Sequence, residues 1–185
     1  TTVTPTYLFM MMPLGALSYD TAQTAWLLIE WACLLGTGLI WWRLLTPGWK
    51  RWAWAAMVAG FSHTLAWKHH VDRGQMYVVL VFLLSLWVAL TRSQRPNWAG
   101  VVAGLLLCVR PPLLLLLAPF IGMRDRAQWC AALISAMIFA LLPMALRGGI
   151  WQDYLSGMKE WSALHRQGDR PRPPAETYPA TIEGI

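Results

Sequence analysis

WAGVVAGLLLCVRPPLLLLLAPFIGM, residues 98–123, contains two apolar runs that are separated by Arg110-Pro111-Pro112. Proline has no N–H for the helical hydrogen-bond ladder and its ring clashes with the preceding turn, so a helix must stop or bend here. A bilayer-spanning helix needs about 20 apolar residues, and each run is shorter. The stretch predicts two short helices that meet at a polar corner inside or near a membrane. The alternative is one continuous kinked helix, with Arg110 reaching an interface.

Arg110 is the charged residue of this corner. An arginine at membrane depth costs about 2.5–3.5 kcal/mol by insertion scales, so it faces a cavity, a partner or a ligand. Its planar guanidinium suits a phosphate, and we predict a phosphate-sized polar site there. The alternative is an ion pair with Glu30, which interrupts another apolar run. We interpret Glu30 as a protonated or hydrogen-bonded carboxyl between helices; a polar group near a substrate route is the alternative.

The composition indicates an integral membrane protein. Hydrophobic residues make up 57% of the chain and charged residues 13%, and many of the 13 tryptophans lie near the ends of apolar runs. Such tryptophans are typical of the membrane–water interface. Cys33, Cys108 and Cys130 all fall inside apolar runs without paired spacing, which predicts buried free thiols. We predict no metal site, no cofactor and no nucleic-acid partner.

Apolar length and loop charge together predict the topology. We expect an all-α, polytopic membrane helical bundle with full spans near residues 23–45, 52–67, 76–91 and 128–146 and the broken hairpin at 98–123. Residues 7–17 are too short to span and predict an interfacial segment. The basic loops at 43–51, 92–95 and 124–126 belong on the cytoplasmic side. Residues 68–75, the Arg110 corner and the region after Leu146 then lie on the outer side.

Two further outer features follow from this topology. Lys68, His69, His70 and Arg73 place positive charge in the 68–75 loop, against the positive-inside rule, which suggests an anionic ligand. Gln75 opens the next span, where it orients a substrate oxygen or merely caps a helix. We expect residues 1–150 to form the transmembrane region, and residues 151–185 to form an outer amphipathic helix and a proline-rich loop. Trp151, Tyr154, Leu155, Met158, Trp161 and Leu164 recur at helical spacing. We predict a helix at residues 151–165, with Trp151, Tyr154, Met158 and Trp161 facing the membrane or the spans.

Several stretches resemble bacterial glycosyltransferase family 87, in the same order as in that family. PTYLFMMMPLGALSYDTAQTAW resembles an early family segment, Gly74-Gln75 before an aliphatic span resembles its GQ motif, and NWAGVVAGLLLCVRPPLLLLLAPF resembles its hairpin. GGIWQDYLSGM resembles the outer helix that follows the next span. Arg110 stands where the family usually has a lysine. The resemblance covers about residues 5–165.

The resemblance implies a GT-C membrane fold and a mannosyltransferase-like activity that uses a polyprenyl-phosphate sugar. A hexose would pass to a lipid or glycan acceptor outside the cytoplasmic membrane, with inversion at the anomeric carbon. Arg110 would hold the donor phosphate, Lys68, His69, His70 and Arg73 are weaker candidates, and Gln75 would orient the substrate. We therefore expect a multi-pass protein of the inner (cytoplasmic) membrane, among membrane lipids of the cell envelope, with its site facing the periplasm or exterior.

The sequence departs from the family in one respect. The acidic residue of GT-C enzymes lies in the first outer loop, and neither Asp20 nor Asp72 matches it, so the catalytic residue is unknown and is expected outside this chain. We expect the chain, which begins at Thr1 without an initiator methionine, to be an internal fragment. The alternative function is a non-catalytic membrane subunit, a lipid-binding or transporter-like protein, or an inactive remnant of the enzyme.

Overall fold

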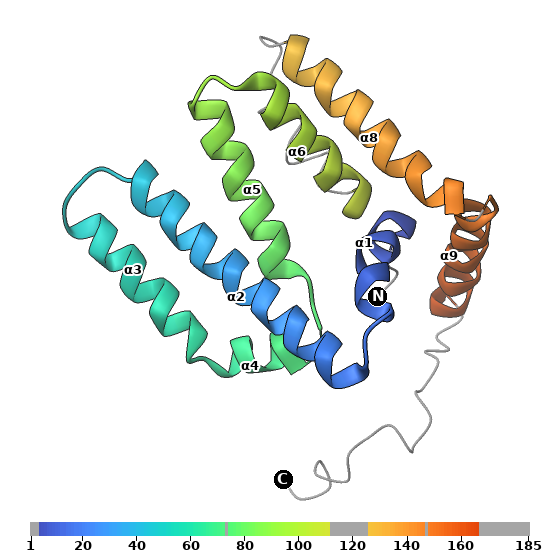
Figure 1. The fold of residues 1–185 in the computed structure, drawn as a ribbon, viewed down its shortest axis with the longest axis horizontal. Helices are drawn as coiled ribbons and strands as arrows, with labels where there is room; N and C mark the ends of the chain where they lie inside the picture. Colours follow the sequence, from blue (N-terminus) through green and yellow to red (C-terminus); the bar gives the residue numbers. More distant parts are fainter. Residues whose placement is uncertain (1–3, 73, 112–125, 147, 167–185) are drawn as a thin grey trace, which may run out of the picture.

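The computed structural model describes residues 4–72, 74–111, 126–146 and 148–166, and every regular element within them is a helix. Contacts between neighbouring helices give the packing order α3, α2, α5, α6, α8, which Figure 1 shows as a row. The all-α fold predicted from the sequence is confirmed. The helices are α1 (Pro5–Gly15), α2 (Tyr19–Leu44), α3 (Trp49–Ser62), α4 (Leu65–Asp72), α5 (Tyr77–Arg92), α6 (Pro96–Val109), α8 (Arg126–Leu146) and α9 (Ile150–Arg166).

Two helices are long and apolar enough to cross a membrane: α2, and α8 from Arg126 to Ala145. Helices α5 and α6 are apolar but shorter. On α2 the side chains of Leu28 and Leu39 are more than 60% exposed, and on α8 that of Leu133 is 62% exposed. Exposed apolar surface on this scale requires a cover other than water, and lipid provides it. We therefore treat the chain as an all-helical membrane protein.

The predicted spans 23–45, 76–91 and 128–146 each correspond to a single helix, whereas the predicted span 52–67 is wrong. Helix α3 ends at Ser62, and α4 begins at Leu65. The hydroxyl of Thr64 donates to the carbonyl of Phe61 at 2.7 Å and accepts from the N–H of Trp67 at 3.2 Å. A side chain that bonds the backbone in this way ends one helix and caps the next. The apolar run therefore holds a turn that hydropathy alone does not show.

Helix α6 stops at the predicted corner. Its last residue is Val109, and Arg110 has φ −141° and ψ 84°, outside the helical region. The alternative of one continuous kinked helix is therefore wrong. The second apolar run of the predicted hairpin, from Pro112 onward, lies outside the described residues.

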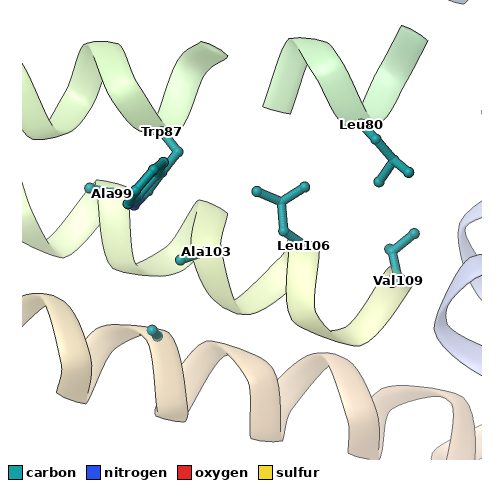
Figure 2. Packing of buried hydrophobic residues seen from close by; sticks show 7 residues of the cluster. Leu80, Trp87, Ala99, Ala103, Leu106 and Val109 are labelled. Carbon is teal, nitrogen blue, oxygen red and sulfur yellow. The ribbon is translucent and has the colours of Figure 1, made fainter. Parts of the chain in front are cut away.

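The core centres on α6, which lies between α5 and α8. Figure 2 shows Trp87 and Leu80 of α5 pointing toward α6, where Ala103 and Leu106 are fully buried. On its other side α6 packs most closely of all against α8. A Cβ at Gly100 would lie 2.5 Å from the carbonyl oxygen of Gln128. Small residues thus let the two backbones approach, as in other membrane helix pairs.

Three basic segments lie together at one end of the bundle, which is the arrangement that the predicted topology requires. Figure 1 places the α2–α3 turn, the α5–α6 turn and the start of α8 at one end of the row. The first two of these carry Arg43, Lys50, Arg51, Arg92 and Arg95, and Arg126 opens α8. Helix α4, the end of α6 and helix α9 lie at the opposite end (Figure 1). Which end faces the cytoplasm remains a prediction from the positive-inside rule.

The terminal helices cover that opposite end. The sequence predicts an interfacial segment at residues 7–17; the structure has helix α1 at Pro5–Gly15, and it contacts α2, α6, α8 and α9. The predicted helix at 151–165 is confirmed as α9. Trp151 is half-buried and donates its indole N–H to the carbonyl of Ala140 on α8 at 2.7 Å, whereas Leu155 is exposed. The side chains of Trp161 and Leu164 lie outside the described part of the molecule.

The three cysteines only partly follow the sequence prediction. Cys33 and Cys108 are buried free thiols, as expected. Cys130 is exposed, so its predicted burial is wrong. It lies on α8 in an apolar run that also presents Leu133 and Ile134 outward. In a membrane helix both the side that packs on other helices and the side that faces lipid are apolar, so an apolar run does not show which of its residues are buried.

Candidate functional site

A buried carboxylate–histidine pair lies between α2 and α4. Glu30 is completely buried, and its Oε1 atom lies 3.0 Å from Nε2 of His70, which is 7% exposed. The contact lacks the alignment of a hydrogen bond, and both oxygens of Glu30 are without such a bond. Burial lowers the pKa of His70. One proton held between the two groups limits the cost of burying them, because an unpaired charge at this depth is strongly unfavourable.

Aromatic rings hold the imidazole of His70 in place. The ring of Trp67 stacks on it with centroids 5.9 Å apart, and Trp31 meets Trp67 edge-on at 5.1 Å. On another side the ring of Tyr77 lies 6.2 Å from His70. Trp67 is itself buried in the cluster that includes Leu34 and Val78. The imidazole is therefore fixed by contacts from α2, α4 and α5.

Arg110 contacts the other end of this cluster. Its Nη2 atom donates to the hydroxyl of Tyr77 at 3.3 Å, and its guanidinium carbon lies 5.5 Å from the centre of the Tyr77 ring. This is a cation–π contact combined with a hydrogen bond to a neutral group. Among the side chains that the structure describes, which do not include that of Asp72, no carboxylate is within ion-pair distance of Arg110. The predicted alternative, an ion pair with Glu30, is not formed, because Glu30 is paired with His70.

Threonine hydroxyls at the start of α1 bond carbonyls of α8 and α6. Pro143 has no N–H for the carbonyl of Phe139, and the hydroxyl of Thr6 donates to that carbonyl at 3.1 Å. The hydroxyl of Thr4 contacts the carbonyl of Val109 in the same way at 3.4 Å. Both threonines are buried. On the side of α1 the end of α6 therefore contacts protein.

The sequence model of glycosyltransferase family 87 matches residues 2–173, which is most of the chain. The chain belongs to glycosyltransferase family 87. Searches of curated proteins and of solved structures each gave no match. The substrates of a glycosyltransferase are a sugar donor and an acceptor, so a site in this family 87 protein must recognise at least one of them.

Of the predicted site residues, this family 87 protein brings together two. His70 and Arg110 both contact Tyr77. Lys68 and His69 lie on the exposed face of α4 and take no part in these contacts. Arg73 lies outside the described residues. Gln75 is half-buried; its backbone N–H donates to the carbonyl of His70 at 3.2 Å.

The predicted helix-capping role of Gln75 is wrong, because α5 has Met76 at its N-cap position and no side-chain cap. Gly74 before it has φ +57°, a conformation that glycine adopts without strain. The GQ pair thus forms the turn that returns the chain from α4 into α5.

Sequence reasoning missed Tyr77 and the pairing of Glu30 with His70. Tyr77 sits among aliphatic residues of α5 and has no motif of its own. Glu30 was recognisable as an acid inside an apolar run, but its partner follows from how α4 folds back onto α2. In this glycosyltransferase the four side chains form one series of contacts from Glu30 through His70 and Tyr77 to Arg110.

Proposed function

We propose that this family 87 protein is a membrane hexosyltransferase of the GT-C type that uses a polyprenyl-phosphate sugar. The sugar is proposed to be mannose, and the acceptor a lipid or glycan outside the cytoplasmic membrane. The observation that carries this proposal is Arg110: a permanent cation at the broken end of an apolar helix, bonded to Tyr77 and without a carboxylate partner among the described residues. A phosphate at the membrane surface is a fitting partner for such a group.

The role of Arg110 follows from where charge develops in the reaction. An acceptor oxygen forms a bond to the anomeric carbon while the bond from that carbon to the phosphate oxygen breaks. The polyprenyl phosphate leaves with the electron pair and gains negative charge. A fixed guanidinium beside it stabilises that charge more strongly than the charge of the bound donor. The acceptor proton goes to a base that we do not assign to any described residue.

Tyr77 and His70 support Arg110 in this proposal. The ring and hydroxyl of Tyr77 hold the guanidinium, so less side-chain freedom is lost when a phosphate binds. His70 contacts the same ring and is fixed in turn by Glu30. We propose no phosphate contact for Lys68 and His69, because both lie on the exposed side of α4.

Placement of the site outside the cytoplasmic membrane is part of the proposal. It is supported by the basic turns at the opposite end of the bundle, which the positive-inside rule assigns to the cytoplasm. The proposed organisation is a transmembrane region up to residue 150, followed by an outer segment that begins with α9. Helix α9 packs against α8 and α1 at this end.

A donor-choice assay tests the proposed function. The protein is expressed from its native gene and purified in lipid nanodiscs. It is then given either a polyprenyl-phosphate mannose or a nucleotide-linked mannose, with total membrane lipid as acceptor. We expect release of polyprenyl phosphate and labelled product only with the first donor. Transfer from the nucleotide sugar alone would contradict the proposal, and saturable binding of the lipid donor without transfer would favour a non-catalytic lipid-binding role.

A further inference from the structure

An apolar groove runs along α2 between α3 and α5. Its volume is about 300 Å³, at the lower end of the range for ligand pockets. Leu34 forms its floor, Met57 and Val58 one wall and Val81 the other. Helices α3 and α5 both pack on α2, and Figure 1 shows α2 between them.

One end of this groove is polar. His70 and Tyr77 line it there, and Tyr77 carries the Arg110 guanidinium on its hydroxyl. The remaining lining is almost entirely apolar. The groove is therefore complementary to an amphiphile that has an anionic head and a hydrocarbon chain. The head would lie at the end where α6 stops.

The dimensions favour a single chain. A groove of about 300 Å³ lined by residues of α2, α3, α4 and α5 accepts one hydrocarbon tail, whereas a bilayer phospholipid carries two. A second groove, on the other face of the α2–α3 pair, is lined by Trp42, Leu39 and Ala55. Neither His70 nor Tyr77 lines that groove, so it lacks the polar end through which the first groove reaches Arg110, and it provides a matched comparison.

We infer that the groove between α3 and α5 receives the first isoprene units of a polyprenyl phosphate, with the phosphate at Arg110 and Tyr77. The inference rests on the proposed function and adds the route of the lipid tail. Met57 is 57% exposed at the groove wall, so the tail enters from the bilayer and does not need to pass through a closed core. Burial of each methylene group of the tail contributes to binding. The phosphate at Arg110 fixes how far along the groove the tail lies.

Photo-crosslinking tests this inference without relying on turnover. The probe is a polyprenyl phosphate with a diazirine in its phosphate-proximal isoprene units, and the purified protein is held in nanodiscs. Adducts are mapped by peptide mass spectrometry. We expect them on the α3 and α5 segments around Met57 and Val81, and we expect unlabelled polyprenyl phosphate to compete while phosphatidylglycerol does not.

Two variants make the result specific to the groove. Met57→Trp fills it, and Leu39→Trp fills the second groove; both wild-type side chains are exposed, so both variants should fold. Adduct yield should fall about tenfold in the first because several methylene contacts are lost, and should stay at the wild-type level in the second. Equal competition by phosphatidylglycerol, or an equal yield in Met57→Trp, would overturn the inference.

The outcomes also separate this inference from the proposed function. A wild-type protein that transfers sugar from the lipid donor but is crosslinked only on α8 or in the second groove would leave the function intact and refute the groove. A protein that uses no polyprenyl donor and gives no competed adduct would overturn both.

Discussion

His70 Nε2 lies 3.0 Å from Glu30 Oε1, and this contact occupies the buried acid of α2 that could otherwise have paired with Arg110. Glu30 lies in the interior of α2 and is completely buried, whereas Asp20 of the same helix lies in its first turn. Because His70 takes it as a partner, the guanidinium of Arg110 rests on Tyr77 alone among the described residues. A cation that is bound only to a neutral ring and hydroxyl retains most of its capacity to bind an anion.

Removing one member of the Glu30–His70 pair should destabilise the protein, whereas replacing both with apolar residues should not. His70→Ala leaves the Glu30 carboxyl buried without a partner and should lower the free energy of unfolding by about 3–5 kcal/mol. The double variant Glu30→Leu with His70→Leu should recover most of this loss, because no buried polar group remains. His69→Ala is the control, since its side chain is exposed. Denaturant titration in detergent measures all three; a double variant that is less stable than His70→Ala would contradict the pairing.

The pair also predicts a pH dependence of stability. Burial lowers the pKa of His70 below its ordinary value of 6.5, so as pH falls through 6.5 the unfolded chain binds a proton that the folded chain does not. The contribution of His70 to stability is therefore fully present above this pH and decreases below it. Among the side chains that the structure describes, Glu30 of α2 and Tyr77 of α5 are the titratable groups that face the ring.

Tryptophan fluorescence melts at about pH 7.5 and about pH 5.5 measure this effect. Acidification should be less favourable for the Tm of wild type than for that of His70→Gln, because only wild type carries the buried imidazole, and His69→Gln should behave like wild type. An equal change of Tm with pH in wild type and His70→Gln would contradict the prediction.

Close packing of α6 on α8 gives a third prediction. A Cβ at Gly104 would meet the carbonyl oxygen of Ala132 at 2.5 Å and collide with Ser135. Gly104→Ala should therefore destabilise by about 1–3 kcal/mol, because backbone atoms have to move apart. Gly60→Ala on α3 is the matched control: its new methyl group meets nothing within 4 Å, and it should gain up to about 1 kcal/mol of helix propensity. Equal effects in the two variants would contradict the packing.

Labelling of single cysteines tests the topology. With Cys33, Cys108 and Cys130 replaced by alanine, Ser93→Cys and His69→Cys place one thiol in the α5–α6 turn and one on α4. We expect a membrane-impermeant maleimide to label only the second of these in intact cells, because basic turns stay cytoplasmic. Labelling of both from the same side would rule out the arrangement in which α5 separates them.

The sequence predicts the class, the helix break at Arg110 and the two ends of the bundle, because proline chemistry, apolar length and loop charge act locally. The turn at Thr64 was not predictable from hydropathy, since a single hydroxyl redirects the chain within an apolar run. The pairing of His70 with Glu30 depends on how α4 folds back onto α2, and the contact of Tyr77 with Arg110 depends on α5 lying beside α6. Such contacts between distant residues leave no local pattern.

The central claim is that Arg110 binds the phosphate of the lipid donor, and the dependence of transfer rate on donor concentration tests it most directly. Arg110 and Arg95 flank the two ends of α6, so Arg95→Gln is the matched control for Arg110→Gln. Loss of a charge-assisted hydrogen bond should lower kcat/KM for the polyprenyl-phosphate sugar by about 10- to 100-fold in Arg110→Gln, with folded yield unchanged. Arg110→Lys should keep part of the activity, and Arg95→Gln all of it. A wild-type kcat/KM in Arg110→Gln would contradict the account.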